Sequence, residues 1–152
     1  MRLKETLVRE AIVDELKAQA RDEVLRELVN ALPDGMNVDR ARLFKILKER
    51  EEQSSTAIRG GVAIPHGRVP GLDKIILSLG RSKQGVEFGA PDNKPTHIFF
   101  LLFAPQEATG EHLRMLARIA RLCQVPNLIT RLLSAKDREE IYQILTEEDD
   151  KL

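Results

Sequence analysis

The tripeptide Pro65-His66-Gly67 is the part of the sequence best suited to chemistry. It follows an apolar run, Val62 to Ile64, that has the length and composition of a short buried strand bounded by turn residues. Pro65 fixes its own φ and favours an extended Ile64, while Gly67 allows a sharp reversal and leaves no side chain beside the imidazole. Neutral imidazole is nucleophilic, and histidine can carry a covalent intermediate. From the tripeptide alone, both a nucleophile and a turn histidine that only hydrogen-bonds the backbone stay open.

Two further residues can bring charge or hydrogen bonds toward His66. Arg50 ends a predicted helix that begins at about Asp39 and precedes the loop leading to His66, and its planar fork suits phosphoryl oxygens. His112 falls in the first turn of another predicted helix, where free N–H groups attract anions and the helix dipole keeps an imidazole neutral. Each residue also has a simpler interpretation. Arg50 can merely complement the helix dipole or pair with Glu51, and His112 can face solvent.

Several segments together form a recognisable signature: Arg50-Glu51, Ser55-Thr56, Gly61 to Gly67 and Glu111-His112-Leu113. They closely resemble the active-site signature of the enzyme IIA components of the bacterial phosphoenolpyruvate-dependent phosphotransferase system, fructose/mannitol type. This family includes the nitrogen-regulatory IIA proteins. The resemblance runs from about residue 3 to about residue 145, and the A-I-P-H-G core preceded by R-E is far more specific than a lone glycine motif. Ala57 and Arg59 stand where many members have glycine or small residues, so the resemblance does not fix the loop conformation or its local charge.

The resemblance implies that His66 accepts a phosphoryl group from the phosphocarrier protein HPr and passes it on. Arg50 and His112 would assist at the same site, and Ser55 and Thr56 would supply hydroxyls or orient His66. No cofactor and no metal are expected. Two roles stay open: a nitrogen-regulatory IIA whose phosphorylation state controls target proteins, which we favour, and a sugar-transport IIA that passes phosphate to a IIB permease domain. In the regulatory role we expect the charge of the phosphoryl group to meet Arg50, Arg59 and Arg68 around His66. A degenerate binding domain is a remoter third, because the R-E and A-I-P-H-G residues are intact.

The composition narrows the class of protein. A chain of 152 residues with 42% apolar residues suits one globular domain with a full core. Basic and acidic residues balance at 24 each, which argues against a basic surface for nucleic acid. No apolar run approaches the roughly 20 residues that span a membrane, and the N-terminus lacks the apolar core of a signal peptide. Cys123 stands alone, so no disulfide framework is expected. We therefore expect a single domain over residues 1–152 that is cytoplasmic and not membrane-embedded.

Other reaction types lack their motifs. The three histidines and Cys123 do not have the spacing of zinc ligands. The sequence contains neither the G-x-S-x-G of serine hydrolases nor a P-loop. His97 opens a very apolar segment outside the signature, and we expect it to be structural.

Hydrophobic periodicity predicts alternating helices and strands, and hence an α/β fold. Helices are expected at about 22–32, 39–50, 110–123, 128–133 and 137–145, followed by a frayed tail at 147–151. Asp39, Thr109 and Asp137 are the expected N-caps. Strands are expected at about 62–64, 75–80 and 96–104, with turns at 68–71 and 84–85 and a short extended piece at 86–88. Residues 1–18 indicate a strand or a loop. The strand at 96–104 is so apolar that it should be buried on both faces, and the resemblance implies a mixed central sheet flanked by helices on both faces.

Overall fold

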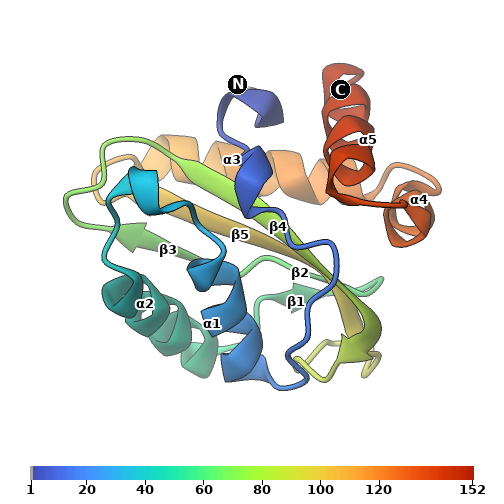
Figure 1. The fold of residues 1–152 in the computed structure, drawn as a ribbon, viewed down its shortest axis with the longest axis horizontal. Coiled ribbons are helices and arrows are strands. Elements are labelled where there is room, and N and C mark those ends of the chain that lie inside the picture. The colour runs from blue at the N-terminus through green and yellow to red at the C-terminus, as the bar shows by residue number, and fades with distance from the viewer. Residues whose placement is uncertain (1) are drawn as a thin grey trace.

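Strand β5 (Thr96–Pro105) is the middle of the sheet in the computed structural model, which describes residues 2–152 (Figure 1). Strand β4 (Ile76–Val86) pairs antiparallel with one edge of β5. On the other edge, β2 (Val62–Ala63) and β3 (His66–Val69) pair parallel with successive parts of β5, and β1 (Ala57–Ile58) pairs antiparallel with β2. The sheet is therefore mixed and five-stranded within residues 2–152.

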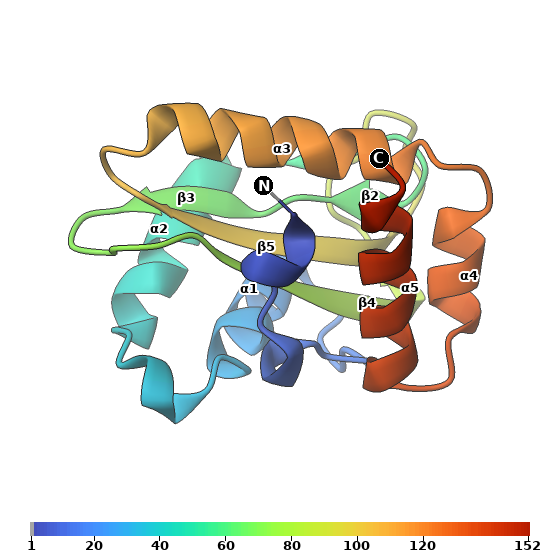
Figure 2. The same cartoon turned by 90° about the horizontal axis from the view of Figure 1, so that it is seen from above.

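Helices cover both faces of this sheet (Figure 2). Their bounds are α1 (Arg21–Asn30), α2 (Arg40–Gln53), α3 (Thr109–Cys123), α4 (Leu128–Ser134) and α5 (Arg138–Asp150). Helices α1 and α2 pack on one face of β5, against Phe99, Leu101 and Phe103. Helices α3, α4 and α5 pack on the other face, against Ile98, Phe100 and Leu102. Alternate residues of β5 thus enter different cores, which confirms the prediction of a strand buried on both faces.

The N-terminal segment covers the outer edge of β4. It does so as loop and short 3₁₀ turns that make isolated bridges, Leu7 with Leu77 and Val13 with Gly80. Covering the edge in this way removes a row of unpaired backbone groups.

Arg81 of β4 connects the N-terminal segment to the end of α4. Its guanidinium is buried and donates to the carbonyl oxygens of Asp14 (2.8 Å), Leu132 (2.8 Å) and Ala135 (2.6 Å). One side chain therefore links β4, the N-terminal segment and the end of α4.

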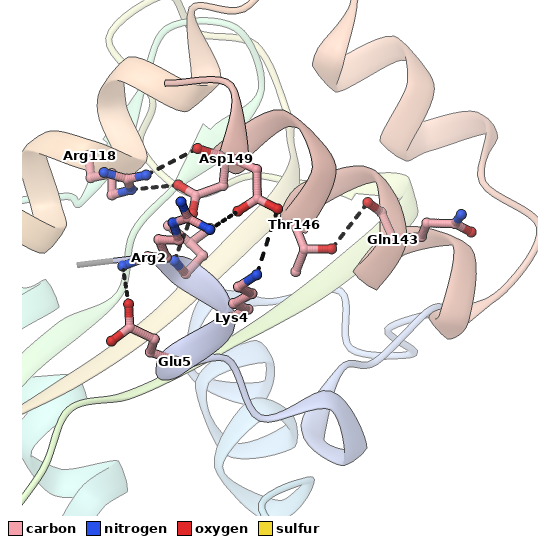
Figure 3. Close-up of polar contacts among 9 residues, drawn as sticks. Arg2, Lys4, Glu5, Arg118, Gln143, Thr146 and Asp149 are labelled. Atoms are coloured by element: carbon pink, nitrogen blue, oxygen red, sulfur yellow. Dashed lines mark hydrogen bonds and ion pairs between the residues drawn. The ribbon is translucent and has the colours of Figure 1, made fainter.

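The prediction of a frayed C-terminal tail is wrong, because α5 continues to Asp150. Asp149 is 1% exposed, and its carboxylate accepts hydrogen bonds from the backbone N–H of Leu3 (2.8 Å) and from the guanidinium of Arg118 on α3. Arg2 and Asp150 form an ion pair at 3.3 Å beside it (Figure 3). Partners distant in the sequence thus hold the last turn of α5, and we call Arg2, Leu3, Arg118, Asp149 and Asp150 the terminal clasp.

Two more expectations differ from the structure. Strand β4 runs on to Val86 through the turn predicted at Gln84-Gly85, and Gly85 (φ +85°) lies within a register irregularity of the strand. Gly67 does not reverse the chain, because it lies in β3, which replaces the start of the turn predicted at 68–71. Its lack of a side chain is needed for a different reason: a Cβ here would collide with Cγ2 of Ile46 on α2.

The capping predictions have mixed outcomes. Asp39 accepts from the backbone N–H of Arg42 at 3.1 Å and caps α2 as predicted. Asp137 caps α5 in the same way, through the N–H of Glu140 at 3.0 Å. Thr109 is not the cap of α3, because the helix begins at Thr109 itself and the preceding Ala108 has no capping side chain. Within residues 2–152, no helix combines the length and apolar composition needed to cross a bilayer.

Candidate functional site

His66 is the first residue of β3 and lies opposite Leu102 of β5. Its Nδ1 is 2.7 Å from the carbonyl oxygen of Ile64. A carbonyl can only accept, so Nδ1 carries the proton and Nε2 keeps its lone pair. Burial lowers the pKa of His66 below its ordinary value, and the positive charge of Arg50 adds to this effect. The half-buried imidazole is therefore neutral at neutral pH, with Nε2 as its nucleophilic atom.

His112 of α3 lies beside His66, with the two imidazole rings in contact. It lies in the first turn of α3, as predicted, and the two ring centroids are 5.3 Å apart at an interplanar angle of 66°. Burial lowers the pKa of His112 to about 4, with further contributions from His66 when it is protonated and from the positive charge of Arg68. The ring is thus neutral, but burial is the largest cause, whereas the sequence suggested the helix dipole. Its Nδ1 is buried and has no hydrogen-bond partner within residues 2–152.

Arg50 approaches from α2, on the face of the sheet opposite α3. It lies in the last turn of the helix, and its guanidinium donates to the carbonyl oxygen of Ser54 at 2.8 Å. Ile46, one turn earlier on α2, lies against Gly67, the neighbour of His66 on β3, so this part of α2 packs beside the strand that carries the imidazole. The positive charge of Arg50 contributes to the lowered pKa of His66. The structure thus brings together Arg50, His66 and His112, the three residues singled out from the sequence.

Arg68 also belongs to this group, as expected from the sequence, although its contact with the start of α3 was not predicted. Two residues after His66 on β3, it shares the same face of the strand. Its guanidinium donates to the hydroxyl of Thr109, the first residue of α3, at 2.8 Å, and its charge lowers the pKa of His112. The i, i+2 spacing of His66 and Arg68 places both side chains on one face only if residues 66–69 form a strand, and that strand was not predicted.

The hydroxyls of Ser55 and Thr56 are engaged with protein groups. Ser55 donates to the carbonyl oxygen of Phe88 at 2.6 Å and accepts from the N–H of Ala57 at 3.0 Å. Thr56 donates to the buried carboxylate of Glu51 at 2.8 Å. In this structure both side chains hold the loop between α2 and β1.

His97 does not join the group. Its Nδ1 bonds the carbonyl oxygen of Ser82 at 2.8 Å. It lies five residues before Leu102 on β5, which places it roughly 16 Å along the strand from the level of His66. Arg59 lies in the exposed turn after β1, and it is not among the charges that lower the pKa of His66 or His112.

The arrangement suits transfer of an anionic group. It combines one unprotonated imidazole nitrogen, two guanidinium groups, carried by helix α2 and strand β3, and the N-terminus of α3. Within residues 2–152, no group of three or more histidine, cysteine, aspartate or glutamate side chains is placed to hold a metal ion.

Known proteins are similar to this chain in sequence and in fold. The family profile described as "Phosphoenolpyruvate-dependent sugar phosphotransferase system, EIIA 2" matches residues 5–148. A nitrogen regulatory protein of Bradyrhizobium diazoefficiens is 36% identical over 136 residues, covering 90% of this chain and 89% of that protein. A fructose-specific EIIABC component of Bacillus subtilis is 31% identical over 98% of this chain, which spans only 24% of that longer protein. The crystal structure of nitrogen regulatory protein IIA-Ntr from Neisseria meningitidis superposes with a TM-score of 0.88 at 33% identity, covering 95% of this chain and 99% of that one.

Proposed function

Because the chain belongs to the EIIA 2 family of the phosphoenolpyruvate-dependent sugar phosphotransferase system, we propose that it carries a phosphoryl group on Nε2 of His66. The donor is a phosphorylated HPr-type carrier protein. The observation that supports this most directly is the hydrogen bond from Nδ1 of His66 to the carbonyl oxygen of Ile64. It fixes the tautomer in which the lone pair is on Nε2.

The transfer is a single in-line displacement. The Nε2 lone pair forms a bond to phosphorus while the bond from phosphorus to the donor nitrogen breaks, and that electron pair returns to the donor imidazole. The proton on Nδ1 of His66 stays in place. The phosphorylated ring then carries a positive charge, which the carbonyl oxygen of Ile64 stabilises through the same hydrogen bond.

The remaining residues of the site position and stabilise charge. Phosphoryl transfer needs little covalent help from the protein, so electrostatic stabilisation carries most of the catalysis. The guanidinium of Arg50 can hold phosphoryl oxygens bidentately, and Arg68 and the N–H groups at the start of α3 add positive potential. His112 is buried and neutral, and it serves as a hydrogen-bonding neighbour of the phosphoryl group.

Within the family we favour a nitrogen-regulatory role over a sugar-transport role. The nitrogen regulatory proteins of Bradyrhizobium and Neisseria are 36% and 33% identical to this chain over nearly its whole length. A phosphoryl group adds about two negative charges at neutral pH. Beside Arg50 and Arg68, this would turn a locally basic surface into a roughly neutral one, so that proteins which recognise the basic form would be released and others admitted.

The phosphoryl site is tested by incubating the protein with phosphoenolpyruvate, enzyme I and HPr, followed by intact-mass measurement. We expect a single acid-labile phosphoryl adduct that is absent from His66→Ala. His97→Ala is the matched control, because its Nδ1 also bonds a carbonyl oxygen, and it should label normally. An adduct that persists in His66→Ala would overturn the assignment.

The regulatory role needs a separate experiment. Immobilised protein, with and without the phosphoryl group, is used to capture target proteins, and the phosphorylated form is offered in parallel to purified fructose-type and mannitol-type IIB domains. We expect at least one target whose binding depends on phosphorylation. Efficient delivery of phosphate to a IIB domain, with no target that responds to phosphorylation, would favour the transport role instead.

A further inference from the structure

Glu51 occupies an unfavourable position for a carboxylate. It lies in the last turn of α2, where the helix dipole disfavours negative charge, and it is only 4% exposed. Burial raises the pKa of Glu51 above its ordinary value, although the hydrogen bonds from Thr56 partly counter this. Removing a carboxylate from water is costly unless its oxygens are well bonded. The hydrogen bonds of the Glu51 carboxylate therefore have to offset this cost.

Both oxygens of Glu51 bond the same residue. Oε2 accepts from the backbone N–H of Thr56 at 2.6 Å, and Oε1 accepts from its hydroxyl at 2.8 Å. Two charge-assisted hydrogen bonds to one residue fix both its position and its orientation. The adjacent Glu52 is exposed, and it forms ion pairs with Lys48, one turn earlier on the helix, and with Arg21 of α1.

From Thr56 a hydrogen-bonded path continues to the nucleophile. The carbonyl oxygen of Thr56 accepts from the N–H of Ile64 at 3.1 Å, across the hairpin of β1 and β2. The carbonyl oxygen of Ile64 accepts from Nδ1 of His66 at 2.7 Å. Glu51 is thus connected to the imidazole through two residues that it does not neighbour in sequence.

We propose that Glu51 is a positioning residue that fixes the tautomer of His66 through Thr56 and Ile64. The inference rests on the proposed function, because a fixed tautomer matters only if Nε2 is the reacting atom. When Thr56 is held, the peptide of Ile64 is held, and its carbonyl oxygen stays in line with Nδ1. When Thr56 is released, that oxygen moves, Nδ1 loses its acceptor and the proton redistributes to Nε2, where it blocks attack.

The tautomer is measured directly by ¹⁵N NMR of the His66 imidazole in the unphosphorylated protein, above its pKa. In the wild type we expect the proton on Nδ1. In Glu51→Ala the Nε2–H form should become substantially populated, and the rate of phosphorylation at saturating phospho-HPr should fall on the order of 10- to 100-fold with little change in KM. Glu51→Gln should retain the Nδ1–H form, because its amide can still accept from the N–H of Thr56 and donate to the hydroxyl.

Two comparisons separate positioning from general destabilisation. Glu52→Ala removes the neighbouring acid of the same turn and should change neither tautomer nor rate. Thr56→Val removes one of the two hydrogen bonds while preserving shape, and should shift the tautomer in the same direction by a smaller amount. If Glu51→Ala fails to fold, Thr56→Val decides the question by itself.

The outcomes distinguish this inference from the function on which it rests. The positioning role is refuted if His66 keeps the wild-type tautomer in a folded Glu51→Ala protein. Where Glu51→Ala does not fold, the same result in Thr56→Val refutes it. Either result counts even if His66 is phosphorylated normally in the wild type. Absence of phosphorylation on His66 in the wild type would instead refute the proposed function, while the NMR measurement would still report whether Glu51 controls the tautomer.

Discussion

Acidification should destabilise the protein through His112. Burial, protonated His66 and the positive charge of Arg68 lower the pKa of this residue from 6.5 to about 4. In the unfolded chain the ring returns to its ordinary pKa, so between these two values the unfolded state binds a proton that the folded state does not. Replacing His112 by glutamine removes the titrating group and keeps a polar side chain in its place.

The sign and size of the effect follow from the two pKa values. A histidine whose folded pKa is depressed leaves stability unchanged above about pH 6.5 and lowers it as the pH falls toward the folded value. For a pKa of about 4, the loss from His112 is about 2 kcal/mol between pH 7 and pH 5, and about 3 kcal/mol once the pH is below 4. His66 also has a lowered pKa and acts in the same direction in both proteins.

Urea unfolding of the wild type and His112→Gln at pH 7 and pH 5 measures this contribution. The wild type should lose about 2 kcal/mol more than the variant over this interval. Comparing the change with pH within each protein removes the intrinsic cost of the substitution. An equal loss in the two proteins would show that His112 is already protonated in the folded state or is solvated there, and would refute the account of its burial.

Three further expectations concern other positions. Arg50→Ala should slow phosphorylation of His66 by about 100-fold in a time-resolved mass assay, whereas Lys48→Ala, on the exposed part of the same helix, should label at the wild-type rate; equal rates in both would remove Arg50 from the site. Gly67→Ala should lower the free energy of unfolding by about 1–3 kcal/mol through collision with Cγ2 of Ile46, and adding Ile46→Leu, which lacks that branch, should recover part of the loss. Arg81→Met should cost roughly 3 kcal/mol in urea unfolding, because the carbonyl oxygens of Asp14, Leu132 and Ala135, the last two in buried hydrogen bonds, lose the guanidinium as donor; a loss below about 1 kcal/mol would mean that water replaces the guanidinium.

The parts of the fold that were predictable are those specified by local pattern. The apolar run of β5 and the caps Asp39 and Asp137 were identified because their signals lie within a few residues. Strand β3 was not, because its residues include a glycine and an arginine and its extended form depends on pairing with β5. The last turn of α5 was missed for a similar reason, since Asp149 is stabilised by Leu3 and Arg118, which lie far away in the sequence.

The same distinction applies to the site. His66 and Arg50 were predicted from their local settings together with a family resemblance, and the structure adds that they approach each other from β3 and α2. Arg68 contacts Thr109, which lies 41 residues later on a helix, so the sequence pattern around Arg68 does not predict this contact. The path through Glu51 runs over backbone atoms of Ile64, which side-chain patterns do not encode.

The terminal clasp brings Arg2 and Asp150 within 3.3 Å, although they are 148 positions apart. Arg2 and Asp150 are therefore close enough in space for a short polar linker to join the two segments at a small entropic cost. A circularly permuted protein, opened at the exposed turn around Asn93, would keep every strand pair of the sheet. The order in which the elements occur along the chain is in this sense separable from the architecture that assembles the site.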